Sequence, residues 1–325
     1  MIKNKTKKTR FLNFICIILI LSLILSLVIM PEKSIITFSQ GIMIWCTKIL
    51  PALLPFFILT NLLSYTTFTT TIGKLLSPIT QKLYGVGGVA GYIFFMSIIS
   101  GYPVGAKLTA DLYRNSTITS GQAISISAFT STSGPLFVIG TVGIGFFHNQ
   151  RLGTILLITH IVGALINGLF FRQKNNKKIV SLQSIVPTTN ILNSSMTSSI
   201  SSIMTIGGFI AIFYMILQTL LHINAFAIPI RLFERINVPS NITISIISGI
   251  IEVTSGALTL SQCQLSTSIA LPILSFLVSF GGLSVHAQAY CFLKDFEMPY
   301  PKFLLQKISH ATISMLLAIP LSYLL

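Results

Sequence analysis

Two charged side chains, Lys107 and Glu252, lie within otherwise apolar stretches of this 325-residue sequence. Lys107 ends the motif Gly101-Tyr-Pro-Val-Gly-Ala-Lys107, whose glycines and proline interrupt a helix, and Glu252 begins the motif Glu252-Val-Thr-Ser-Gly256. A charge at membrane depth costs about 2.5–3.5 kcal/mol on insertion scales, and such residues usually have a function. We therefore expect both charges to contribute to a binding site. The alternative is a structural ion pair, for example between Lys107 and Asp111 one turn later.

Two longer apolar segments are also interrupted, by Thr130-Ser-Thr-Ser-Gly-Pro135 and by Phe280-Gly-Gly-Leu-Ser-Val-His-Ala-Gln288. Breaks of this kind leave backbone N–H groups free at the start of a half-helix, where anions bind. The alternative is that these small and polar residues serve close packing and bonding between helices. The four breaks together predict a binding site made of Gly101, Tyr102, Pro103, Lys107, Thr132, Ser133, Gly134, Glu252, Thr254, Ser255, Gly281, Gly282, Ser284 and Gln288.

The sequence lacks the residue patterns of an enzyme. It contains no paired-carboxylate site, no nucleophile with a base, no cluster of metal ligands and no phosphate-binding loop. The four scattered cysteines are expected to be free thiols, and His160, His222 and His310 are expected to be structural. The chemistry that remains is binding, with no cofactor and no metal ion.

The composition is that of a polytopic membrane protein. Hydrophobic residues make up 52% of the chain and charged residues 8%, against about 25% charged residues in a soluble domain. A net charge of +15 would favour nucleic acid as the partner of a soluble protein. Here no basic surface domain exists to bind nucleic acid, and the positive-inside rule accounts for the charge better.

The order of apolar segments and breaks predicts an all-α protein in five parts. A basic cytoplasmic tail (1–10) precedes a transmembrane anchor (11–30) and a short exit loop (31–34). The first repeat (41–171) holds a span, an interfacial connection, a hairpin with its tip at 101–107, a broken helix at 123–147 and a plain span. After a cytoplasmic linker (172–197), the second repeat (198–325) has a hairpin tip at 252–256 and a broken helix at 268–292. Each hairpin arm is about half the length that spans a bilayer, so we expect both hairpins to be re-entrant.

The two halves match in spacing. Gly101 and Glu252 are 151 residues apart, as are Leu152 and Phe303, and Gly134 precedes Gly281 by 147. Agreement of several landmarks at one offset indicates an internal repeat. The first copy then crosses the membrane three times, so the second copy is inverted. Secondary transporters have this plan, with the substrate site on broken helices where the repeats meet.

The basic residues support this topology. With a cytoplasmic N-terminus, all of the 21 basic residues lie on the cytoplasmic side except Lys33, Lys48, Arg151, Arg231 and Arg235. Lys307, near the start of the last span, counts among the cytoplasmic residues. The asymmetry follows the positive-inside rule.

Five motifs in order carry a resemblance to a known family. They are Gly101 to Lys107, Thr132-Ser-Gly-Pro-Leu-Phe137, Gly140-Thr-Val-Gly-Ile-Gly145, Glu252 to Gly256 and Phe280 to Gln288. Over about residues 40 to 325 the sequence resembles the sporulation integral membrane protein family YlbJ, also called SpoVV, of the Gate or nucleoside-recognition superfamily. The resemblance implies a fold like that of concentrative nucleoside transporters.

The resemblance also implies a substrate and a location. Family membership implies transport of dipicolinic acid across the outer forespore membrane during sporulation. Lys107, the hydroxyl cluster and half-helix N-termini suit such a dianion, while Glu252 would carry a coupling proton, be neutral, or pair with Lys107. The coupling ion, a proton or sodium, and the oligomeric state, including a homo-oligomer, stay open. Two alternatives remain: a transporter of nucleosides or another small polar solute in the bacterial cell membrane, and a non-transporting scaffold for spore-envelope assembly.

Overall fold

The structure is a computed structural model that describes residues 14, 17, 20–21, 23–25, 27–173 and 190–325. These residues form helices and contain no strand, which confirms the all-α prediction. The basic tail predicted at 1–10 lies outside the described residues, as do part of the anchor (11–30) and most of the linker (172–197).

From Pro31 on, three helical segments follow one another without a loop. α2 (Pro31–Ile44) continues through a π-helical segment, η1 (Trp45–Ile49), into α3 (Leu50–Ser64). The exit loop predicted at 31–34 is therefore wrong, because α2 begins there. Proline is well tolerated at the first position of a helix, since its missing N–H would have no acceptor in the helix anyway.

The first hairpin has the break that the sequence predicts. α4 (Phe68–Tyr84) and α5 (Val89–Ser100) meet at a bend of 101°. α5 is followed after three residues by α6 (Val104–Arg114). The two arms are 12 and 11 residues long, too short for either to cross a bilayer alone.

The second broken element is α7 (Ser120–Thr130) followed by the π-helical η2 (Leu136–Phe146). The predicted plain span is α8 (Gln150–Phe170). Next comes α9 (Ile191–His222), a single helix of 32 residues. The boundary predicted at 197/198 between a linker and the second repeat therefore falls inside a helix, because the Ser/Thr/Asn-rich residues there continue the helix of the following apolar segment.

The second half repeats the order of elements with tighter breaks. After α10 (Ala227–Glu234), the hairpin arms α11 (Ser240–Ile251) and α12 (Val253–Ser261) are separated by Glu252 alone. Only Gly281, with φ 87°, separates α13 (Thr267–Phe280) from α14 (Gly282–Leu293). The chain ends with η3 (Lys294–Phe296), α15 (Tyr300–Leu321) and η4 (Ser322–Leu324). The break predicted over 280–288 is thus confined to its first residues, and Ser284, His286 and Gln288 lie on α14.

Among the described residues, four helical stretches are long and apolar enough to cross a membrane. They are Gln150–Phe170, Ile191–His222, Thr267–Phe296 and Tyr300–Leu324, and the count rises to six if two bent pairs are each one span. This agrees with a polytopic membrane protein.

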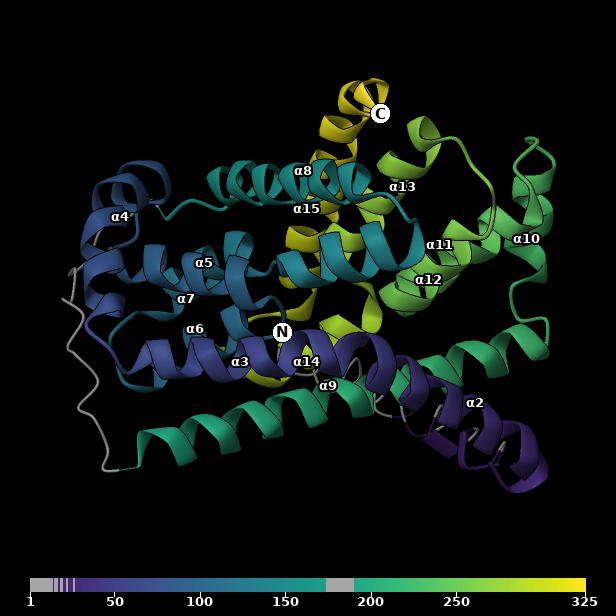
Figure 1. The fold of residues 1–325 in the computed structure, drawn as a ribbon, viewed down its shortest axis with the longest axis horizontal. Helices are drawn as coiled ribbons and strands as arrows, with labels where there is room; N and C mark the ends of the chain where they lie inside the picture. Colours follow the sequence, from purple (N-terminus) through teal and green to yellow (C-terminus); the bar gives the residue numbers. More distant parts are fainter. Residues whose placement is uncertain (1–13, 15–16, 18–19, 22, 26, 174–189) are drawn as a thin grey trace, which may run out of the picture.

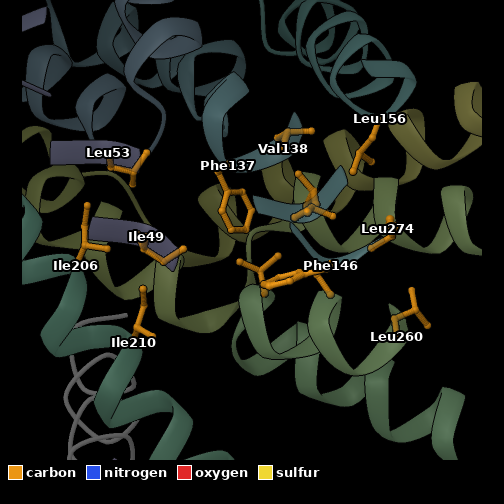
Figure 2. Packing of buried hydrophobic residues seen from close by; sticks show 14 of the residues in the cluster. Ile49, Leu53, Phe137, Val138, Phe146, Leu156, Ile206, Ile210, Leu260 and Leu274 are labelled. Atoms are coloured by element: carbon orange, nitrogen blue, oxygen red, sulfur yellow. The ribbon is translucent and has the colours of Figure 1, made fainter. Parts of the chain in front are cut away.

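The two hairpins lie at opposite ends of the long axis. Figure 1 shows α5 and α6 beside α7 toward one end, α11 beside α10 toward the other with α12 next to α11, and α9 along one edge next to α2 and α3. An apolar cluster fills the space between the hairpins. Figure 2 shows its side chains arriving from distant segments, among them Ile49, Phe137, Ile206 and Leu274.

Labelling at the two ends of α8 tests the predicted topology. His148 and Arg172 flank this helix and are both exposed. In a background without other cysteines, His148→Cys and Arg172→Cys should react with an impermeant maleimide from opposite faces, with position 172 cytoplasmic by the positive-inside rule. Reaction of both positions from the same face would contradict a crossing by α8.

Candidate ligand-binding site

One cavity touches three of the four helix breaks and α14, the helix that follows the fourth break. It has about 60 Å³ of free space, room for only a few water molecules. Its polar lining comes from the α5–α6 break, the α7–η2 break, the α11–α12 break and α14, and its apolar lining from η1, α3, η2 and α9. The predicted residues that line it are Gly101, Tyr102, Ser133, Gly134, Glu252, Thr254, Ser284 and Gln288. Pro103, Lys107, Thr132, Ser255, Gly281 and Gly282 are not in its wall.

The first two breaks touch backbone to backbone. A Cβ added to Gly101 would lie 2.6 Å from the amide nitrogen of Gly134, and Gly101 has φ 74°. Glycine is therefore required there both for space and for conformation. Thr132 lies behind this contact, where its hydroxyl bonds the Ser97 hydroxyl at 2.8 Å. The hairpin tip and the broken helix of the first half thus form one wall of the cavity.

The other two breaks are also in contact. A Cβ added to Gly282 would lie 3.0 Å from the Gly249 carbonyl and 3.0 Å from the Val253 amide, so the start of α14 packs on the second hairpin. Glu252 is 1% exposed and caps α12. Its carboxylate accepts hydrogen bonds from the Thr254 N–H (3.1 Å), the Ser255 N–H (2.7 Å) and the Ser255 hydroxyl (2.8 Å). Two of the N–H donors at the start of α12, those of Thr254 and Ser255, are therefore already occupied.

His160 occupies a donor of the α7–η2 break. The Ser133 N–H donates to His160 Nε2 at 2.8 Å, and His160 Nδ1 lies 2.8 Å from the Ser279 hydroxyl. Since a backbone N–H can only donate, Nε2 carries no proton. His310 Nε2 in turn bonds the His160 carbonyl at 2.9 Å. Both histidines thus have the structural role that the sequence predicts.

Several polar groups at the cavity lack partners. Within the described part of the chain, the hydroxyls of Ser100 and Ser284 are buried without a hydrogen bond, and the Gln288 amide also lines the cavity. No side chain caps the N-termini of α6 and α14, whose dipoles are positive at that end. η2 likewise begins without a side-chain cap, whereas Glu252 caps α12. In the described part of the chain, no three His, Cys, Asp or Glu residues are grouped to hold a metal ion.

Lys107 lies away from the cavity. It is half-buried, and its ammonium donates to the Ser198 hydroxyl on α9 at 2.8 Å. The ion pair considered for it with Asp111 is absent from the described residues, in which Asp111 pairs with Arg114 at 3.2 Å. Arg114 also bonds Asp295 at 2.9 Å. Lys107 and Glu252 are therefore not equivalent charges of one site.

A buried cation, Lys307, bonds the cavity-lining residue Tyr102, although the charge pattern predicts that Lys307 is a cytoplasmic charge. It is 1% exposed on α15. Its ammonium donates to the Tyr102 hydroxyl and, at 3.1 Å, to the Ser131 carbonyl, and lies 4.8 Å from the centre of the Tyr102 ring. The signal that could have found it is a polar stripe at helical spacing on α15, formed by Gln306, Lys307, His310 and Ser314, all buried.

The fold and site define a class: an integral membrane protein in which helix breaks from both halves of the chain surround one cavity. A family model described as nucleoside recognition (Gate) matches residues 46–150, which include the first hairpin and the first broken helix. The chain is also 32% identical over 323 residues to Sporulation integral membrane protein YlbJ of Bacillus subtilis (strain 168). That match covers 90% of this chain and 79% of the relative.

This similarity places the chain in the family of Sporulation integral membrane protein YlbJ, as the motifs predict. No solved structure matches the chain. The likeness to concentrative nucleoside transporters and the inversion of the second repeat stay predictions.

Proposed function

We propose that this protein is a transporter of a small organic anion, with dipicolinic acid moved across the outer forespore membrane as the leading candidate. The observation that carries the proposal is the cavity lined by three helix breaks and by α14, which begins at the fourth break. Broken helices at the middle of a repeat structure form the substrate sites of secondary transporters. Breaks in lipid are otherwise costly, because interrupted backbone must be buried or line a cavity.

The charges and dipoles around the cavity favour an anion. In the described residues no carboxylate is within salt-bridge range of Lys307, and a buried cation without a counter-ion is costly. The uncapped starts of α6 and α14 add partial positive charge. Glu252 opposes an anion, but its charge is compensated by two backbone N–H groups. A proton or sodium ion at Glu252 is the coupling ion that we propose.

Dipicolinic acid fits this chemistry as a flat dianion. The free space of about 60 Å³ is small for it, so movement of the hairpins has to open the site, as expected for alternating access. The printed name of the B. subtilis relative connects it with sporulation, and we propose the same setting for this chain. The N-terminus is then cytoplasmic.

Nucleosides are the second candidate, because the family model that matches the first hairpin is described as nucleoside recognition. A nucleoside is neutral and presents several hydroxyls and a base. The Ser100 and Ser284 hydroxyls and the Gln288 amide are groups that could bond it. A neutral nucleoside, however, gives the buried charge of Lys307 beside the cavity no function in binding.

Uptake into liposomes distinguishes the candidates. Liposomes that contain the purified protein should take up radiolabelled dipicolinate at least tenfold faster than liposomes without protein. Unlabelled uridine should not reduce this rate. Uptake of uridine without dipicolinate would reject the anion proposal in favour of nucleosides. In cells, deletion should give spores low in dipicolinate while the mother cell still makes it, and normal spore dipicolinate would count against the proposed role in sporulation.

A further inference from the structure

Lys307 is the buried charge that neither the sequence motifs nor the family match assigns to a site. It comes from α15, outside the residues matched by the Gate model. Its two hydrogen-bond acceptors, the Tyr102 hydroxyl and the Ser131 carbonyl, are uncharged. Removing an ammonium from water without an opposite charge costs several kcal/mol, and two neutral acceptors offset only part of that. Among the described residues, therefore, no opposite charge bonds this buried ammonium.

Tyr102 stands between this cation and the cavity. Its side chain lines the cavity, whereas Lys307 does not. Its hydroxyl accepts from the ammonium and donates to the Ser131 carbonyl, and its ring lies against the ammonium. A Cβ added to Gly281 would lie 3.7 Å from this hydroxyl, so the hydroxyl sits at the uncapped start of α14. Tyr102 therefore contacts both the cavity and Lys307, at the place where the start of α14 also favours negative charge.

We infer that Lys307 is the residue that makes the site selective for carboxylates, and that the Tyr102 hydroxyl is a stand-in ligand which an entering carboxylate displaces. This inference rests on the proposed function as an anion transporter and names the group that sets its charge selectivity. Displacement exchanges a neutral acceptor for a charged one, and hydrogen bonds to charged groups are roughly twice as strong. The Ser131 carbonyl, 3.1 Å from the ammonium, holds the ammonium in place while the Tyr102 side chain turns aside.

Binding measurements on the purified full-length protein in detergent test the inference with three probes: dipicolinate, its neutral diamide pyridine-2,6-dicarboxamide, and uridine. Lys307→Gln should lower the affinity for dipicolinate at least about thirtyfold, as expected for loss of a buried charge partner. It should change the affinity for the neutral diamide by less than about threefold, because a substitution that removes no direct contact with the ligand has only a small indirect effect on binding. The matched control is Lys302→Gln, which removes an exposed lysine from the same helix and should change neither affinity.

Tyr102→Phe supplies a second test if Lys307→Gln fails to fold. This substitution keeps the ring on the ammonium and removes only the hydroxyl. Dipicolinate then no longer competes with the Tyr102 hydroxyl for the ammonium. We expect it to bind about fivefold more tightly, which corresponds to the net free energy of one hydrogen bond. Unchanged or weaker dipicolinate binding by Tyr102→Phe would overturn the displacement.

The outcomes separate the inference from the proposed function. Dipicolinate binding by Lys307→Gln within threefold of the parent protein would overturn the role of Lys307 and leave anion transport standing. Binding of uridine alone by the unaltered protein, or of no probe at all, would overturn both.

Discussion

Replacing Glu252 with alanine should destabilise the protein and abolish uptake. The carboxylate accepts from two buried backbone N–H groups and from the Ser255 hydroxyl. Each N–H left unpaired costs about 1–3 kcal/mol, so the two together cost of the order of 2–6 kcal/mol. Thermal unfolding in detergent measures the loss of stability, and liposome uptake measures the loss of function.

Glu252→Gln distinguishes the contribution of Glu252 as a helix cap from the contribution of its negative charge. An amide still accepts through its oxygen but turns its NH2 toward a donor, so we expect a smaller loss of stability than with alanine and a loss of uptake of at least tenfold. The exposed Glu234 of α10 provides the control, and Glu234→Ala should leave both measurements unchanged. Full uptake by Glu252→Gln would contradict the proposed coupling role of Glu252. A normal spore phenotype with Glu252→Gln, combined with a loss of uptake, would favour the scaffold over the transporter.

Gly256→Ala should force apart the two arms of the second hairpin. A Cβ at this position would collide with Cα and N of Gly249 and lie 2.9 Å from the Ser245 carbonyl. Overpacking usually costs about 1–3 kcal/mol, and the collision here is with backbone, which cannot rotate away. We expect a loss of about 3 kcal/mol or more, measured by thermal unfolding, together with a loss of uptake because Val253 and Thr254 line the cavity.

The matched control for this prediction is Gly208→Ala on α9. No atom lies within 4 Å of the added Cβ, so alanine gains helix propensity of up to about 1 kcal/mol without a clash. Equal melting temperatures for Gly256→Ala and Gly208→Ala would show that the arms of the hairpin are not in the close contact that the structure has.

The helix breaks could be predicted from the sequence because the residues that cause them lie at the breaks themselves. Gly101, Pro103 and Gly134 end or interrupt helices through their own backbone preferences, and the structure has breaks at both places. The polar run at Ser131 to Gly134 is likewise non-helical. Helical lengths were less predictable: α2 begins at Pro31 and α9 at Ile191, because polar residues remain helical when an apolar segment continues the same helix.

Which lysine lies at the site could not be predicted from the residues that surround each lysine in the sequence. Lys107 and Lys307 both lie in helices near apolar segments, and residue type alone does not tell them apart. Contacts from other segments do: Ser198 of α9 binds Lys107, whereas Tyr102 and Ser131 bury Lys307. The free N–H groups expected at the breaks were also partly taken, by Glu252 and by His160, since a buried donor needs an acceptor.

The sequence alone was enough to predict a helical membrane protein with four helix breaks and to identify its family. Composition, the positions of glycine and proline, and the order of motifs are all properties of individual segments, so they can be read without knowing how the segments pack. The meeting of the breaks at one cavity and the placing of Lys307 rather than Lys107 behind it depend on which helices pack together. Gly101 against Gly134 and Gly282 against Val253 are contacts between residues about 30 positions apart, and Tyr102 with Lys307 joins residues about 200 apart. A helix break follows from the residues that form it, whereas the environment of a charge follows from the neighbours that tertiary packing brings to it.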